Sequence, residues 1–219
     1  YSVTGVQTCA LPISPNIERI HLILPTKSEI PKSILKLEKL KELIIECEPA
    51  EIEIEDWSAT MTQLDICGYI VEDWISDLKS LESIVLESGI IQLPDILWEF
   101  PNLKHLMINC IYLCSPQIFL HDLPVLEELC IYDAKEPLLQ KIGTLKSLRV
   151  LEITGRLTSL PTQIESLLQL EELSLGCELH HLPASIGHLT SLKILDLEAN
   201  KLMDLPESFG KLEIGRAHV

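Results

Sequence analysis

The sequence predicts an α/β fold: a right-handed solenoid of about nine repeats, with parallel strands on a concave face and short helices or irregular segments on a convex face. Three observations predict it. One apolar pattern returns at intervals of 20 to 23 residues. Within each copy, apolar residues alternate with other residues, as they do along a half-buried strand. Finally, 41 Leu and 27 Ile among 219 residues supply the apolar surface that such a stack buries.

The strand signature is Leu-x-x-Leu followed, after one residue, by Leu or Ile. In one copy, Leu195 and Leu197 must face one side of the strand while Asp196 faces the other. The three clearest copies have a period of 22 and stand at Leu148/Leu151/Ile153, Leu170/Leu173/Leu175 and Leu192/Leu195/Leu197. Six earlier copies complete the set of nine: Ile17/Ile20/Leu22, Leu40/Leu43/Ile45, Met61/Leu64/Ile66, Leu81/Ile84/Leu86, Leu103/Leu106/Ile108 and Leu126/Leu129/Ile131.

A second signature, Leu-Pro, follows the last three strands. It leads into apolar residues three apart, such as Ile164 and Leu167, which can share one side of a short helix or 3-10 turn. Residues 46–60 lack the Leu-Pro pair and alternate acidic residues with Ile, so an extended or irregular convex segment is expected there; residues 109–120 are also atypical. The three Leu-Pro pairs of the second signature are Leu160-Pro161, Leu182-Pro183 and Leu205-Pro206.

Stacking of the repeats makes this pattern stable. No single unit can bury its own Leu residues, but neighbouring units can place strand beside strand about 4.8 Å apart and join their Leu columns into one core. A fully buried Leu or Ile contributes roughly 1.5–3 kcal/mol. The strands run in one direction because each connection returns over the convex side, and such crossovers are right-handed.

These motifs resemble the leucine-rich repeat, and the resemblance covers residues 14–212. The stretch Leu-Pro-x-x-Ile-Gly-x-Leu-x-x-Leu at 182–192 looks like the repeats of plant disease-resistance proteins and of intracellular Ras-pathway scaffolds. The resemblance implies that a partner binds the concave strand surface.

Leucine-rich repeats often carry Asn or Cys just after the strand, where the buried side chain bonds neighbouring backbone groups. Asn200 fills this slot here, and the resemblance implies the same role for Cys47, Ser88 and Cys177. The other repeats depart from the pattern, so we expect a discontinuous ladder.

The two ends of the chain are set apart from the repeats. Residues 1–13 and 213–219 resemble translated sequencing-adapter DNA, because codons for Ala-Leu-Pro-Ile and for Glu-Ile-Gly-Arg-Ala can be largely reverse complements. We expect adapter-derived tails around a leucine-rich repeat domain at 14–212, a fragment without capping units. Such a fragment is expected to fray or self-associate at residues 17–22 and beyond residue 197.

The charge balance excludes several kinds of partner. The chain has 33 Asp and Glu against 17 Lys and Arg, so its formal net charge is −16. Nucleic-acid backbones and anionic membranes both need a basic surface. No apolar run reaches the roughly 18 residues that a membrane-spanning helix needs.

Phosphate-binding glycine loops, the metalloprotease motif and the Gly-x-Ser-x-Gly elbow are absent, which favours a protein that is not an enzyme.

The outward strand positions predict an acidic interaction surface. Ten carboxylates fall on the concave face, against one basic residue, Arg19. We therefore expect a protein partner with a basic patch, anchored also on Met107, Tyr132 and Val150. The alternative is that the acids only keep a Leu-rich protein soluble. The predicted partner-binding residues are Glu42, Asp65, Glu87, Met107, Glu128, Tyr132, Val150, Glu152, Glu172, Asp196 and Glu198.

The cysteines and histidines point to no specific chemistry. Cys110 and Cys130 fall on adjacent strands, the latter in an outward column, where a disulfide or thiolate cluster is the alternative to small, partly buried thiols in a reducing compartment. His180-His181 lack a third metal ligand. We predict no cofactor, no metal and no small-molecule ligand. The cysteine pattern and the lack of Asn-x-Ser/Thr sequons favour a cytoplasmic location.

Together these features predict a protein–protein interaction module that recognises a ligand or serves as a scaffold, in signalling or innate immune recognition. The alternative is the substrate-recognition part of a larger enzyme, such as a receptor kinase or a ubiquitin ligase, whose catalytic domain lies beyond the repeats.

Overall fold

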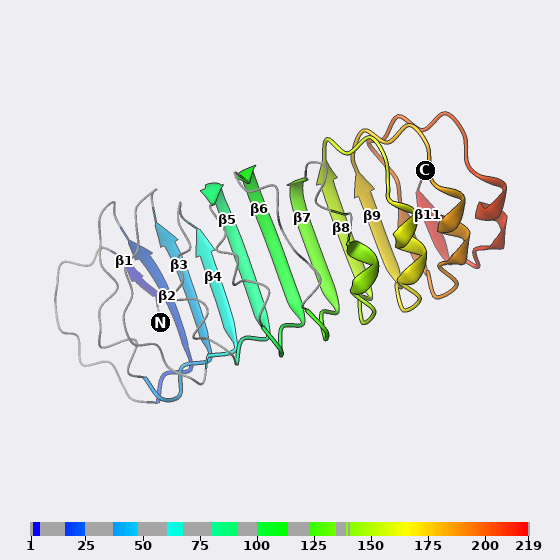
Figure 1. Cartoon of the computed structure of the whole chain (residues 1–219). Coiled ribbons are helices and arrows are strands. Elements are labelled where there is room, and N and C mark those ends of the chain that lie inside the picture. The colour runs from blue at the N-terminus through cyan, green and yellow to red at the C-terminus, as the bar shows by residue number, and fades with distance from the viewer. Residues whose placement is uncertain are drawn as a thin grey trace. The chain divides into compact units, whose positions relative to one another are not determined.

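The computed structural model is a parallel-strand solenoid (Figure 1). It describes residues 2–4, 16–24, 37–47, 61–67, 80–91, 100–113, 123–134, 139 and 141–218. The chain divides into two compact units, the first formed by residues 1–103 and 107–115 and the second by residues 104–106 and 116–219.

The first unit contains parallel strands that pair in chain order. The strands are β1 (Ser2–Thr4), β2 (Arg19–Leu24), β3 (Glu42–Cys47), β4 (Gln63–Cys67) and β5 (Ser83–Ile91). The register places Ile20, Leu43, Leu64 and Ile84 side by side. All four are buried, so the column of apolar residues predicted for this unit is confirmed. Strand β6 (His105–Leu113) has residues in both units.

The second unit repeats the same arrangement. Its strands are β7 (Glu128–Ala134), β8 (Val150–Gly155), β9 (Glu172–Gly176), β10 (Ile194–Asp196) and β11 (Arg216–His218), again parallel and in chain order. The register aligns Leu129, Leu151, Leu173 and Leu195, each at most 1% exposed. The strand signature therefore marks the buried face of this sheet, as predicted.

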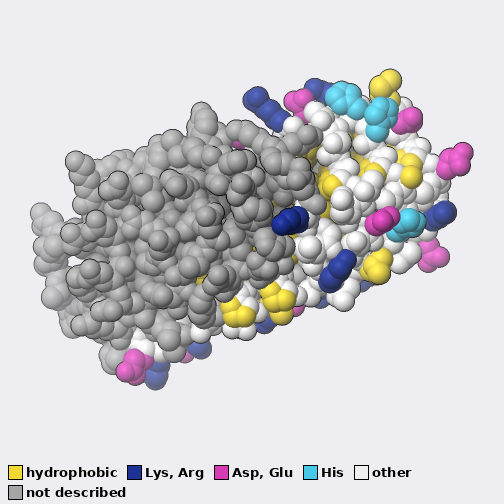
Figure 2. Space-filling view, viewed as in Figure 1, with side chains coloured by type: hydrophobic (Ala, Val, Ile, Leu, Met, Phe, Trp, Pro, Cys, Tyr) yellow, Lys and Arg dark blue, Asp and Glu magenta, His cyan; other side chains and the backbone are white. Residues whose placement is uncertain are grey.

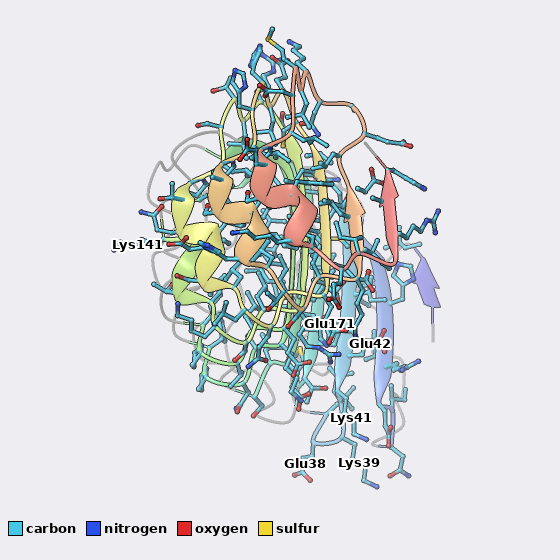
Figure 3. All side chains as sticks on the ribbon, turned by 90° about the vertical axis from the view of Figure 1, so that its right-hand side faces the viewer. Glu38, Lys39, Lys41, Glu42, Lys141 and Glu171 are labelled. Atoms are coloured by element: carbon cyan, nitrogen blue, oxygen red, sulfur yellow. The ribbon has the colours of Figure 1, made fainter. Side chains whose placement is uncertain are left out.

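The Leu-Pro signature marks the start of the 3-10 turns. Pro161, Pro183 and Pro206 precede η5, η6 and η7 with φ near −65°, the value that the proline ring imposes. In the second unit the turns lie on one side and the strands on the other, with the core between them (Figure 3). The turns are η4 (Ile142–Thr144), η5 (Thr162–Ser166), η6 (Ala184–His188) and η7 (Glu207–Lys211).

The described helical segments are all of the 3-10 type, and none of them is long and apolar enough to cross a membrane. The sequence had left a short helix or a 3-10 turn open, and the structure decides for the turn. The α/β class and the count of nine repeats stay predictions.

Successive turns pack so closely that a side chain has no room at two glycines. A Cβ on Gly187 would lie 2.4 Å from the backbone oxygen of Ser208, and one on Gly143 would lie 2.6 Å from the backbone oxygen of Gln163. Gly210 occupies the equivalent place in the last turn and has nothing within 4 Å. The lack of a side chain at these two glycines therefore allows neighbouring turns to approach this closely.

The last turn is more exposed than the turns before it. Leu205 is 40% exposed, whereas Leu160 and Leu182, at the same place in earlier repeats, are each 6% exposed.

Strands β1 and β11 lie in the predicted tails and pair in parallel with β2 and β10. The adapter origin of the tails, the boundaries of the repeat domain and the fraying of its ends stay predictions.

The slot after the strand is filled as the resemblance implies in two repeats. Asn200 bonds backbone groups of its own repeat and of the preceding one. Cys177 is buried, with its sulfur 3.5 Å from the backbone oxygen of Ile153. The side chains of Cys47 and Ser88 lie outside what the structure describes.

Candidate interaction surface

The outward strand face consists of the strand side chains that alternate with the buried Leu and Ile residues. On β7, Leu129 and Ile131 are fully buried, whereas Glu128 and Tyr132 reach solvent. The period of two along a strand explains this alternation.

The structure brings all seven of the predicted partner-binding residues of the second unit onto this face. Those that it describes there are Glu128 and Tyr132 on β7, Val150 and Glu152 on β8, Glu172 on β9, and Asp196 and Glu198 on and after β10. None of them is buried. The alternating pattern therefore predicted the exposure of these side chains correctly.

The predicted residues of the first unit are described less fully. Glu42 on β3 and Met107 on β6 are partly exposed. The backbone of Asp65 pairs with those of Ile44 and Val85 in the predicted register. The side chains of Asp65 and of Glu87 on β5 lie outside what the structure describes. The charge of Glu42 is balanced by Arg19, which forms an ion pair with it.

Cys130 corrects the prediction for the outward columns. It was expected to face solvent, but it is only 4% exposed. Its sulfur lies 3.9 Å from a carboxylate oxygen of Glu128. A thiol is short, so longer neighbours can cover it. Burial, with the negative charges of Glu128 and Glu152, raises the pKa of Cys130 from 9.0 to about 12.

Tyr132 belongs to the same group of side chains. Partial burial and the negative charge of Glu152 raise the pKa of Tyr132 from 10.0 to about 12. Glu128 also has a neighbour on the preceding strand, because His105 Nδ1 lies 2.9 Å from its Oε2. The sequence contains both residues, 23 positions apart, but a 23-residue spacing alone does not tell which outward side chains meet.

The edge formed by the amino-terminal ends of the strands shows a different charge pattern. Glu171, just before β9 and labelled in Figure 3, pairs with Arg149 one repeat earlier and with Lys193 one repeat later. In the first unit, Lys41 pairs with Glu18 in the same way at 3.1 Å. These edge pairs were not predicted from the sequence, although opposite charges 22 or 23 residues apart indicate them.

Bonds to Lys193 and Arg149 hold the pKa of Glu171 below its ordinary value. Glu171 is therefore neutralised by basic side chains of the two neighbouring repeats. Glu128 and Glu152 differ, because no ion pair with Lys or Arg reaches either of them within the part of the chain that the structure describes.

Histidines connect neighbouring repeats outside the strands. His188 Nδ1 lies 2.9 Å from Glu165, and His181 Nδ1 lies 3.1 Å from Asp204, each pair 23 residues apart. In the view that shows the turns, charged side chains of the described residues are scattered among neutral ones (Figure 2). His181 thus has a carboxylate partner of its own.

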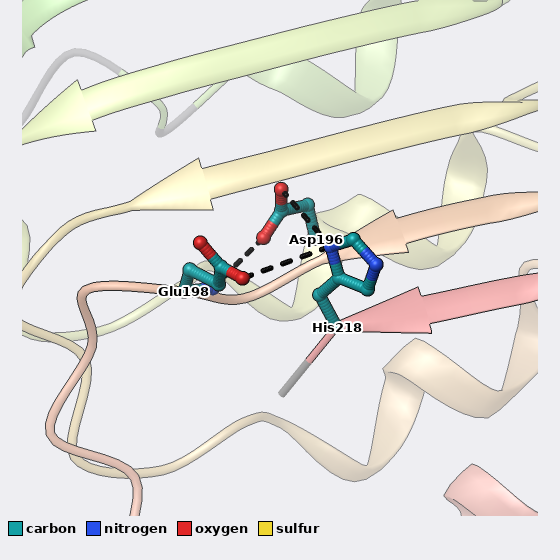
Figure 4. A group of neighbouring side chains, drawn as sticks. All are labelled: Asp196, Glu198 and His218. Carbon is teal, nitrogen blue, oxygen red and sulfur yellow. Dashed lines mark hydrogen bonds and ion pairs between the residues drawn. The ribbon is translucent and has the colours of Figure 1, made fainter.

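One group has ligand types that suit a metal ion. Nδ1 of His218 lies 3.7 Å from Glu198 and 4.0 Å from Asp196 (Figure 4). Among the described residues this is the only group of three such side chains whose ligand atoms all lie within 4.8 Å of one another. The side chain of Glu198 is 72% exposed, and exposed acidic groups of this kind are common without an ion. His218 also belongs to the predicted adapter tail.

Solved structures of known proteins share the fold. A leucine-rich repeat protein of Leptospira interrogans matches with a TM-score of 0.71 at 20% identity, over 90% of this chain and 53% of that chain. Toll, solved in its complex with Spatzle as a molecular hub of Drosophila development and innate immunity, matches with a TM-score of 0.69 at 16% identity, over 99% of this chain and 36% of that chain.

The chain thus spans about half the length of the first of these proteins and about a third of the second. No protein-family model and no curated protein matches it by sequence. With its in-register strands, its buried Leu columns and its likeness to these structures, the chain has the fold of a leucine-rich repeat protein.

Proposed function

We propose that the chain is a protein-interaction module without enzymatic activity, and that it binds a basic protein partner through the outward strand face, its predicted concave surface. The observation that carries the proposal is the difference between two sets of carboxylates. Glu171 at the edge is held by Lys193 and Arg149, whereas Glu128 and Glu152 on the face have no Lys or Arg partner among the described residues.

Electrostatics favours a basic partner for such a face. Neighbouring carboxylates without cations repel one another, and a partner that supplies the cations relieves the repulsion. Complementary charge also speeds the encounter of two proteins and rejects partners of the same sign. Apolar side chains on the same face, including Val150, would add burial at the centre of the interface.

The structural neighbours support a binding role in general. Toll is a leucine-rich repeat protein solved with a protein ligand, Spatzle. By analogy we propose ligand recognition or scaffolding in signalling or innate immunity for this chain. From the sequence pattern we also propose a cytoplasmic location and a domain of nine repeats. The competing proposal, a substrate-recognition part of a larger enzyme, uses the same face and differs in what is joined to it.

The test is the affinity for an Arg/Lys-rich peptide, measured against salt concentration. The test variant carries Glu128→Lys, Glu152→Lys and Glu172→Lys on the outward strand face. The control variant carries Glu165→Lys, Asp204→Lys and Glu207→Lys, which lie on or beside the turns and change the net charge equally. We expect the first variant to bind at least about tenfold more weakly, a loss of about 1.4 kcal/mol, and the second to bind nearly as the parent does. Salt-insensitive binding, or equal losses in the two variants, would refute the proposal.

A further inference from the structure

Given the proposed binding of a basic protein to the outward strand face, we propose that the anchoring group of the partner is the guanidinium of an arginine, seated beside Tyr132 and between the carboxylates of Glu128 and Glu152.

The strands place these side chains around one small floor. Glu128, Cys130 and Tyr132 occupy alternate positions of β7, and the register with β8 shifts after Ile131. Glu152 on β8 stands directly beside Cys130 in the register. Cys130 is 4% exposed, whereas Glu128, Tyr132 and Glu152 all reach solvent. The buried thiol thus has two carboxylates and one phenol at neighbouring strand positions.

The two carboxylates act on the same neighbours. Both of their charges help to raise the pKa of Cys130 and that of Tyr132. Within the described residues, the imidazole of His105 contacts Glu128, and no basic side chain contacts Glu152. Even with His105 protonated, the carboxylate of Glu152 keeps the group negative.

The chemistry of Glu128, Glu152 and Tyr132 favours a guanidinium over an ammonium. A guanidinium is planar and offers five N–H donors, so it can bond two carboxylates at once and stack on an aromatic face. Tyr132 supplies such an aromatic face at a partly exposed position. Val150 pairs with Glu128 in the register and offers an apolar neighbour for the methylene groups of the arginine.

A bare metal ion suits this place less well. Among the described residues, only Asp196, Glu198 and His218 bring three ligand atoms within 4.8 Å of one another, and the Glu128–Glu152 group does not. A guanidinium, which can bond two carboxylates at once, suits the pair Glu128 and Glu152 better.

The experiment compares two peptides of equal length and charge, in which every basic residue is Arg in one and Lys in the other. We expect the parent chain to bind the Arg peptide about 3- to 10-fold more tightly. Tyr132→Leu and Glu152→Gln should remove this preference, while Tyr132→Phe, which keeps the ring, should retain most of it. The matched control is Glu172→Gln on the same face, which should weaken both peptides alike and leave their ratio unchanged.

The outcomes separate this inference from the proposed function. If both peptides bind equally and still lose affinity in the triple charge-reversal variant, the acidic face binds basic proteins and the arginine anchor is wrong. If the preference exists but survives both Tyr132→Leu and Glu152→Gln, the anchor lies elsewhere and the inference is also wrong. If neither peptide binds at low salt, the proposed function fails together with the inference.

Discussion

The side-chain oxygen of Asn200 accepts a hydrogen bond from the backbone nitrogen of Cys177 at 3.2 Å, across the boundary between two repeats. The same oxygen accepts a bond from the backbone nitrogen of Leu179 at 3.3 Å, and its amide nitrogen donates to the oxygen of Leu197 at 2.7 Å. Strand β9 ends at Gly176, so these backbone groups have left the sheet and need other partners. One side chain supplies them.

Replacing Asn200 by Ala should lower the free energy of unfolding by about 1–3 kcal/mol, because several backbone groups at a part-buried place lose their partner. Urea unfolding followed by circular dichroism measures this change. The control is Gln169→Ala, which removes an exposed amide and should change stability by less than about 0.5 kcal/mol. Equal effects of the two substitutions would show that the Asn200 bonds do not stabilise the repeats.

The glycines of the turns offer a matched pair of substitutions. Gly187→Ala places a Cβ 2.4 Å from the backbone oxygen of Ser208, so neighbouring turns must move apart, at a cost of about 1–3 kcal/mol. Gly210→Ala meets nothing within 4 Å and should be neutral or slightly stabilising, because alanine restricts the unfolded chain. Differential scanning calorimetry should therefore show a lower Tm for the first variant alone. A similar decrease in both would contradict the packing of the turns.

The thiol of Cys130 should be unusually inert. With a pKa of about 12 in place of 9.0, its thiolate fraction at pH 8 falls from about one in ten to about one in ten thousand. Alkylation by iodoacetamide at pH 8, mapped by peptide mass spectrometry, should modify Cys130 at least about a hundredfold more slowly in the native chain than in urea. Equal rates in the native chain and in urea would place this thiol at the surface.

The same pKa difference gives stability a pH dependence. The unfolded thiol ionises near pH 9 and the folded one near pH 12, so the unfolded chain releases this proton first. The contribution of Cys130 is therefore fully present below pH 9 and is lost as the pH rises from 9 to 12. Cys130→Ala should reduce this alkaline loss of stability.

Glu171 should titrate below the ordinary range of a glutamate, because Lys193 and Arg149 stabilise its charged form. An NMR titration of the carboxyl carbon should show this lowered pKa, and Lys193→Ala should raise it towards the ordinary value of 4.5. Lys211→Ala removes an equal charge outside the edge pairs and should have little effect. Since the folded pKa is lowered, the stabilisation is present above the unfolded pKa and is lost as the pH falls through the folded one.

How far the sequence predicts this molecule depends on which interaction decides each feature. The 22-residue period aligns Leu151, Leu173 and Leu195 correctly, because burial of one face forbids any other register. The Leu-Pro pairs mark the turns because proline fixes the backbone. These features are local or periodic, and a single sequence carries them fully.

Features that depend on side-chain length and on neighbours one repeat away were harder to predict. The pattern placed Cys130 outward, and its alternation is right, but the short thiol lies beneath Glu128 and Glu152. The edge pairs of Glu171 were not predicted, because they lie at the position before the strand, beside the outward columns. The exposure of Glu128, Glu152 and Glu172 was predicted, and their binding role stays a proposal.

The central claim is that the repeats stack as parallel strands in one register and present an open outward face. Ser174 and Asp196 are outward residues paired across β9 and β10, so their Cα atoms are about 5 Å apart, within the range of a disulfide. Cys130 lies two strands from residue 174, about 9–10 Å away and beyond that range. The measurement is the disulfide map of the Ser174→Cys, Asp196→Cys variant after mild oxidation of the folded chain. The account predicts a bond between positions 174 and 196; a bond from 174 to Cys130, or no bond in the folded chain, would contradict it.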